Sequence, residues 1–145
     1  MEIKDKVWCF DNEEWRDIKG YEGLYQVSNC GRVKSLNYNH TKTDKVLCEK
    51  HHKSNYVTVM LCKNGKTKRF SVHRLVAQAF IPNPNNLPII NHKDENPSKN
   101  IVDNLEWCDY EYNNNYGTLH KRRSEIAKTY KRNRDNLGRF YKGDD

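Results

Sequence analysis

The hydrophobic period of the sequence changes once, near residue 72, and this change limits the folds open to the chain. Before it, short runs of β-branched and aromatic residues are interrupted by Gly and Asn. After it, the apolar residues of "VHRLVAQAF" recur at three- and four-residue intervals, which predicts a short amphipathic helix over 72–80. The prolines of "IPNPNNLP" then end that helix. We therefore predict an α+β protein with short elements and a β-rich front section over 1–71.

Strand character in the front section is found in five runs: "YQVS", "RVKSL", "KVLCEK", "YVTVMLC" and "KRFSV". The first two flank "NCG", which is typical of a tight turn. The last two flank "KNGK", whose Asn-Gly pair is a strong signal for a two-residue hairpin. The front section is therefore predicted to form one small antiparallel sheet.

Two more short strands are expected after the prolines, in "LPIINH" and "DNLEWC". The segment between them, "KDENPSKNIV", is too long and polar for a two-residue turn and is predicted to be a loop. A further helix is expected to begin at Asp109 and to break at Gly117. Residues 88–116 would then form a strand, loop, strand, helix unit in which His92, Asn104 and an asparagine of the helix converge.

Basic residues are concentrated late in the chain. Seven Lys or Arg and one Glu lie between Thr118 and Arg134, a local charge of +6 within a total of +7. A basic helix is predicted over about 119–133, and such a segment is expected to meet a polyanion. A solvated helix that only aids solubility is the alternative.

Composition excludes several classes of protein. Hydrophobic residues make up 35% of the 145 residues, enough for a modest core. No stretch approaches the roughly 20 apolar residues of a membrane span, and the first residues lack the apolar core of a signal peptide. The five cysteines are scattered without a C-x-x-C pair, so reduced thiols are expected. The protein is predicted to be cytoplasmic and not secreted.

The residue types around His92 suit phosphodiester cleavage. A neutral imidazole can take a proton from water near neutral pH. Amide oxygens, offered by Asn91 and by the asparagines at 113–115, can hold a hard divalent cation. Taken alone this pattern is weak, because Asn and His in a loop are more often turn formers.

The order of the motifs adds a family resemblance. "INHKDEN…NIVDNLEW…YNNN" closely resembles the HNH nuclease motif of phage and intron-encoded homing endonucleases, and "VHRLVAQAF" resembles the helix that precedes it. "EEWRDIKGYEGLYQVSNCGRVKSL" resembles a small module that often stands ahead of that motif. The three blocks cover about residues 13–116. The resemblance implies a ββα-metal core and a DNA endonuclease of a bacterial or phage-infected cell.

The resemblance also implies roles for individual residues. His92 matches the general base, and Asn104 matches the middle asparagine that holds the loop and so the histidine. Asn91 and Asn113 match the ligands of a single divalent metal ion, Mg²⁺ or Mn²⁺, with Asn114 as a substitute for Asn113. In the turn after the histidine, Glu95 departs from the family, because a glycine usually stands there.

Double-stranded DNA is the expected partner, with no membrane and no obligate protein partner. On a predicted strand, Arg32 and Lys34 alternate and so share one face, where they could meet a duplex. The further candidate DNA contacts are Arg74, Lys121, Arg122, Arg123, Lys131 and Arg132. The implied domains are a DNA-binding module over 1–71, the nuclease core over 72–117, and a basic helix and tail over 118–145.

Two alternatives stay open at this stage. A non-catalytic nucleic-acid-binding protein could keep the same scaffold, with its Asn-rich loop serving only as a turn. A zinc-stabilised interaction module could use Cys48 and His51, with His52, but no second half-site completes it.

Overall fold

The computed structural model describes residues 12–51 and 55–129. The chain divides into two compact units, with Asp109 the last residue of the first and Tyr110 the first of the second. The first unit holds the strands and helix α1 (Val72–Phe80), and the second holds α2 (Tyr110–Asn115) and α3 (Leu119–Thr129). Among the described residues, no helix is long and apolar enough to cross a membrane.

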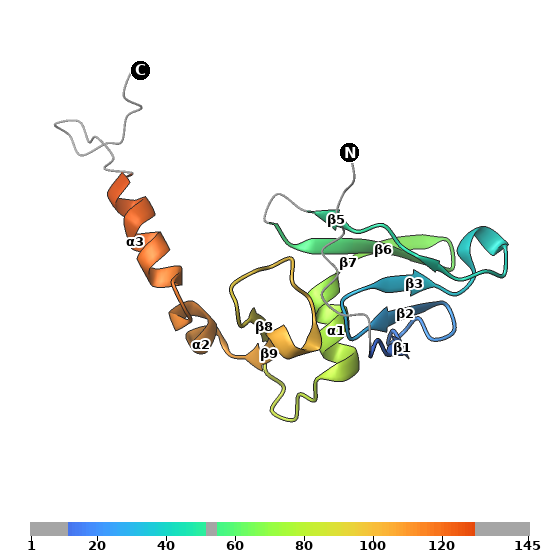
Figure 1. Ribbon diagram of the computed structural model, residues 1–145, viewed down its shortest axis with the longest axis horizontal. Coiled ribbons are helices and arrows are strands. Elements are labelled where there is room, and N and C mark those ends of the chain that lie inside the picture. Colours follow the sequence, from blue (N-terminus) through green and yellow to red (C-terminus); the bar gives the residue numbers. More distant parts are fainter. Residues whose placement is uncertain (1–11, 52–54, 130–145) are drawn as a thin grey trace, which may run out of the picture. The chain divides into compact units, whose positions relative to one another are not determined.

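The front section forms two antiparallel sheets, shown in Figure 1. The first contains β1 (Trp15–Asp17), β2 (Tyr25–Ser28), β3 (Val33–Ser35) and β4 (Lys45–Val46), in that order. The second contains β5 (Lys50–His51), β6 (Val57–Lys63) and β7 (Lys66–Ser71).

The prediction of a single sheet is therefore wrong. The run "KVLCEK" does not form one strand: its beginning pairs with β3 and its end pairs with β6. Strand β1 was not predicted, because "WRD" is short and polar. The predicted hairpin is confirmed, with Asn64 and Gly65 at φ values of 52° and 74° between the paired ends of β6 and β7. A type I′ turn needs two such positive angles.

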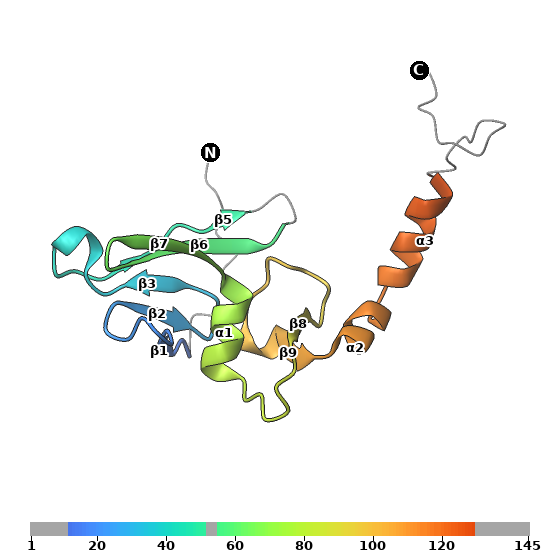
Figure 2. The ribbon, with the colours of Figure 1, turned by 180° about the vertical axis from the view of Figure 1, so that it is seen from behind.

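Helix α1 is confirmed with the predicted bounds. Figures 1 and 2 show it between the front sheets and a hairpin of β8 (Ile89–His92) and β9 (Leu105–Cys108). A 3₁₀ helix, η2 (Val102–Asn104), lies in the connection between the two strands, directly before β9. The buried face of α1 is made of Val72, Leu75, Val76 and Ala77. Arg16 donates to the Ala79 carbonyl (2.8 Å) at the helix end, and the Trp107 indole donates to the Ile81 carbonyl (3.0 Å).

One hydrophobic core runs through the first unit. It joins Val27 and Val33 of the first sheet and Leu61 of the second to Leu105 of β9, with α1 between them. The core spans the predicted boundary at residue 71, so the front section and the β8–β9 hairpin depend on the same apolar contacts.

Among the four cysteines that the structure describes, one differs from the prediction. Cys48, Cys62 and Cys108 are free thiols, but Cys30 is disulfide-bonded. The expectation of reduced thiols throughout is therefore wrong. Spacing in a sequence does not reveal which sulfur atoms a fold brings within bonding reach.

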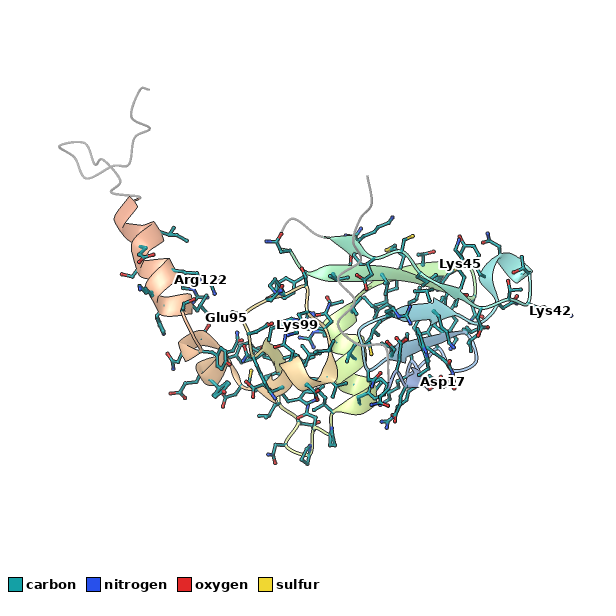
Figure 3. All side chains as sticks on the ribbon, in the orientation of Figure 1. Asp17, Lys42, Lys45, Glu95, Lys99 and Arg122 are labelled. Carbon is teal, nitrogen blue, oxygen red and sulfur yellow. The ribbon has the colours of Figure 1, made fainter. Side chains whose placement is uncertain are left out.

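Helix α3 carries the start of the basic segment in the second unit. Lys121, Arg122 and Arg123 are exposed on it, and Arg122 is labelled in Figure 3. The predicted contacts Lys131 and Arg132 lie outside the described residues.

The turn after β8 places Glu95, labelled in Figure 3, in the left-handed region at φ 59°. Its N–H donates to the His92 carbonyl (2.9 Å), which closes the turn. We expect Glu95→Gly to be more stable than Glu95→Ala by about 1 kcal/mol, because a Cβ is unfavourable at positive φ. Urea unfolding of the two variants measures this difference, and the alanine variant controls for loss of the carboxylate. Equal stability of the two would contradict a strained turn.

His73, in the first turn of α1, has a buried Nδ1 without a hydrogen-bond partner in the described chain. Burial lowers the pKa of its imidazole to about 4, helped by the nearby His92 and Arg74. Between this value and the ordinary pKa near 6.5, the unfolded chain binds a proton that the folded chain does not. Stability therefore falls as the pH falls through that range.

We expect this loss to reach at most about 3 kcal/mol at pH 4. His73→Gln should show a shallower dependence of unfolding free energy on pH than the wild type. His92→Gln serves as the comparison, since it removes the other buried imidazole. Identical pH profiles for wild type and His73→Gln would show that His73 does not titrate in this way.

Candidate active site

The β8–β9 hairpin places His92 beside the loop that joins the two strands. In the antiparallel register, Asn91 lies opposite Glu106, and His92 lies opposite Leu105. Four polar residues of this region are nearly enclosed, with exposed fractions of 7, 6, 4 and 6% for Asn91, His92, Asn100 and Asn104. Buried polar groups are costly unless they are hydrogen-bonded, so their partners define the site.

One buried hydrogen bond fixes the His92 ring. The Nε2 atom of His92 lies 2.8 Å from Oδ1 of Asn100. An amide oxygen can only accept, so this bond places the ring proton on Nε2 and leaves the lone pair on Nδ1. The tautomer is thus suited to accept a proton at Nδ1.

The surroundings keep His92 neutral. Burial lowers the pKa of its imidazole and outweighs the hydrogen bond with Asn100 and the charge of Asp94, which both act to raise it. A neutral ring is the form that can act as a base.

Two other rings lie around His92. The ring centroids of His73 and His92 are 5.3 Å apart in an edge-on arrangement, and Tyr56 lies 6.0 Å from His92. Tyr56 is exposed, whereas the Nδ1 atom of His73 is buried. The imidazole of His92 is thus held among rings as well as by Asn100.

Asn104 ties together both ends of the loop. Its amide nitrogen donates to Oδ1 of Asp94 (2.9 Å) and to the Lys99 carbonyl (2.8 Å), and its Oδ1 accepts the Asp94 N–H (3.1 Å). Figure 3 labels Lys99 on this loop, and its ammonium lies 3.7 Å from the Asp94 carboxylate. The loop after His92 is therefore closed by one buried side chain.

Asp94 has the contacts of a turn-forming residue. Its Oδ1 also accepts the N–H of Asn96 (2.9 Å), the bond of an Asx turn. Burial acts to raise the pKa of its carboxyl, but the bonds from Asn96 and Asn104 and the nearby Lys99 and His92 leave it lowered. These bonds engage Oδ1, and the Lys99 ammonium faces Oδ2, so both oxygens of Asp94 have partners within the loop.

Asn91 presents an amide oxygen. Its Nδ2 donates to Oε1 of Glu106 across the hairpin (2.8 Å). This bond turns the amide so that no hydrogen bond from the described residues engages its Oδ1. A neutral oxygen held in this way is chemically suited to a hard divalent cation.

The candidate DNA contacts of the first unit are engaged within the protein. The Arg32 guanidinium forms an ion pair with Glu13, with Nε donating to Oε1 at 2.9 Å, and lies over the Trp15 ring. Lys34 lies 4.5 Å from the centroid of the same ring and 3.6 Å from an Asp44 oxygen.

These contacts give Arg32 and Lys34 a structural role in the first sheet. Arg74 is exposed on α1, and its guanidinium donates to the Pro88 carbonyl (3.3 Å). DNA contacts by the three residues stay predictions.

Asn113 lies on α2, in the second unit. Its ligand role, like that of Asn114, stays a prediction. In the first unit, the structure brings His92, Asn91 and Asn104 into one hairpin and its loop.

Two residues of the site were not predicted. Asn100 and Glu106 stand within the quoted motif, but no role was assigned to either. The signal for Asn100 is the demand of a buried imidazole for an acceptor, and seven residues separate His92 from Asn100. Glu106 could have been found from the strand register, which places it opposite Asn91.

Zinc finds no support in the part of the chain that the structure describes. Residues 12–51 and 55–129 contain no group of three or more His, Cys, Asp or Glu placed to hold a metal ion. Cys48 itself is an exposed free thiol. The predicted site with amide oxygens is of a different kind, because asparagines supply its ligands.

Comparison with known proteins gives consistent matches. A family model described as the NUMOD4 motif matches residues 13–62. The DNA endonuclease I-HmuI of Bacillus phage SP01 is 44% identical over 100 residues, which are 69% of this chain and 55% of that protein. An HNH endonuclease of Acanthamoeba polyphaga mimivirus, described as uncharacterized, is 38% identical over 103 residues, 71% of this chain and 29% of its own length. The chain therefore spans about half, or less, of these curated relatives.

The fold matches as well. A solved structure described as DNA binding and cleavage by the HNH homing endonuclease I-HmuI superposes with a TM-score of 0.65 and 37% identity, covering 82% of this chain and 68% of that chain. The predicted α+β class is thereby confirmed at the level of mixed sheet and helix. Matching motifs, sequence identity and fold lead to one conclusion: the chain belongs to the HNH homing endonuclease family.

Proposed function

We propose that this protein is a metal-dependent DNA endonuclease that hydrolyses phosphodiester bonds, with His92 as the general base. The observation that carries the proposal is the enclosed, neutral His92 ring, whose Nε2 is held by Asn100. The names of the relatives agree with it, since I-HmuI is described as a DNA endonuclease.

His92 would act through Nδ1. This nitrogen takes a proton from a water molecule, whose oxygen attacks the phosphorus of a backbone phosphate in line with the leaving oxygen. The bond from phosphorus to the 3′ oxygen breaks, and the departing oxygen takes a proton from solvent water, leaving 5′-phosphate and 3′-hydroxyl ends. Asn100 keeps the ring in one tautomer and orientation, and Asn104 holds the loop on which Asn100 stands.

Asn91 and Asn113 would hold a single Mg²⁺ or Mn²⁺ ion. The fit rests on donor chemistry: Asn91 keeps an amide oxygen available while Glu106 binds its nitrogen. When bound, such an ion stabilises the negative charge that develops on the leaving 3′ oxygen. Neutral amides are weaker metal ligands than carboxylates. We therefore expect a low affinity for the metal ion in the absence of DNA, since a DNA phosphate would complete the coordination shell of the ion.

Double-stranded DNA is the proposed substrate. The exposed Lys121, Arg122 and Arg123 of α3 would contact phosphates along the duplex, with Lys131 and Arg132 continuing the basic segment. Arg74 is a further phosphate contact of the first unit. Arg32 and Lys34, whose charged groups lie over the Trp15 ring, would meet DNA from the first sheet.

A non-catalytic DNA-binding protein on the same scaffold is the second candidate. The exposed basic residues of α3 favour binding whether or not His92 is catalytic. The two functions differ only in cleavage.

Cleavage is tested with supercoiled plasmid and Mg²⁺ or Mn²⁺. We expect wild type to relax or linearise the plasmid, and His92→Gln to be slower by about 100-fold or more, the typical contribution of a general base. Glutamine keeps a polar side chain that cannot accept a proton at neutral pH. The control is His40→Gln, at an exposed histidine of the front section.

Equal rates for wild type and His92→Gln would remove His92 from the reaction. If purified wild type binds DNA but cuts none with either metal, the non-catalytic candidate is correct.

The metal assignment is tested at three neighbouring asparagines of α2. We expect Asn113→Ala to raise the Mg²⁺ concentration for half-maximal cleavage by about tenfold or more, since a ligand is lost. Asn114→Ala and Asn115→Ala are matched controls on the same short helix and should leave this concentration unchanged. A larger effect at residue 114 would transfer the role to that asparagine, and no effect at any of the three would exclude α2 as a source of ligands.

A further inference from the structure

A turn of the front section packs against the loop that holds His92. Gly31, in the turn between β2 and β3, is buried at φ +84°. A Cβ built at Gly31 would lie 2.8 Å from the carbonyl oxygen of Asn100 and 3.1 Å from its Cβ. The two backbones therefore approach as closely as a glycine allows.

A hydrogen bond adds to this contact. The Val102 N–H donates to the Asn29 carbonyl (3.0 Å), so the same turn contacts Asn100 and the residue two positions after it. Earlier in the loop, the Ser98 hydroxyl donates to the Asn55 carbonyl (3.3 Å). The front section thus supports the loop at several points within the first unit.

The turn is itself fixed. The Ser28 hydroxyl accepts the N–H groups of Cys30 (3.2 Å) and Arg32 (3.0 Å). The Asn29 side chain accepts the Glu14 N–H (2.8 Å) and donates to the Asn12 carbonyl (3.0 Å). A surface held by this many bonds can act as a support for its neighbour.

Asn100 links this support to the ring of His92. Its backbone abuts Gly31, and its side chain accepts the Nε2 proton of His92 at 2.8 Å. Asn100 is 4% exposed, so it has little room to move without disturbing one of its two contacts.

We propose that the Asn29–Gly31 turn is a positioning element for His92, acting through Asn100. The proposal rests on the proposed function, because it assigns the turn a part in setting the base of that reaction. The turn lies inside the segment that matches the NUMOD4 motif. That segment would then contribute to the rate of cleavage, separately from any contact it makes with DNA.

The test uses two glycines with the same backbone angle. Gly31 and Gly20 both have φ +84°, but a Cβ at Gly20 meets nothing within 4 Å. Alanine at either site introduces the same backbone strain, while only Gly31→Ala displaces Asn100. We expect Gly31→Ala to lower kcat by about tenfold to 100-fold, since small misplacements of a catalytic group are costly. Gly20→Ala should keep the wild-type kcat.

A purely structural role of Gly31 would not lower kcat while leaving the binding of DNA unchanged. We expect Gly31→Ala to keep the wild-type KM and the wild-type Kd for the same duplex, measured without divalent metal. Nitrogen-15 NMR of the His92 ring should show loss of the single Nε2-protonated tautomer in Gly31→Ala and its retention in Gly20→Ala.

Variants of Asn100 test the link without touching the turn. Asn100→Asp keeps an acceptor oxygen and should keep more of kcat than Asn100→Leu, which has similar size and no acceptor. Gly31→Ala should add no further loss of kcat in the Asn100→Leu background, because residues that act in series are not additive.

Several outcomes would overturn the proposal. Equal kcat for Gly31→Ala and Gly20→Ala, in a wild type that cuts DNA, would show that the turn does not position His92. Additive losses in the double variant would show that Gly31 acts by another route. A wild type that cuts no DNA defeats the proposed function instead, and the two failures are thereby distinguished.

Discussion

The hydrogen bond between the buried imidazole of His92 and the amide of Asn100 is the interaction on which the site depends. It selects the ring nitrogen that carries the proton, and it satisfies a polar atom that burial would otherwise leave unpaired. Asn104 closes the loop, η2 ends it, and α1 provides the apolar surface on which the hairpin rests.

The core of the first unit explains how so small a chain supports such a site. A chain with few apolar residues cannot build separate cores for a sheet module and a hairpin of two short strands. Here α1 serves both, because its buried residues belong to the same cluster as Val27, Leu61 and Leu105. The stability of the hairpin is therefore drawn partly from residues far ahead of it in sequence.

Much of this fold could be predicted from the sequence, where local signals are strong. Helix 72–80 was found with its bounds because its apolar period and the following prolines agree, and the Asn-Gly hairpin was found from its turn. The division of the front section into two sheets could not be predicted, because "KVLCEK" has the composition of one strand and only tertiary pairing divides it. Similarly, the motif gave His92 and Asn104, but Asn100 required knowledge of which amide a closed loop brings to the ring. The ion pair of Arg32 with Glu13 joins residues 19 positions apart and has no local signal.

The close approach of Gly31 to the Asn100 carbonyl has a consequence for how such proteins are assembled in evolution. A segment that travels between genes as a self-contained unit needs a smooth boundary with its new neighbour. In this chain the boundary is a close backbone contact. Gly31 has no Cβ, and the Asn100 carbonyl lies where a Cβ would need space. Recombination that joins this front segment to an unrelated catalytic loop would have to preserve this close contact. The front segment and the loop are therefore expected to be inherited as a pair.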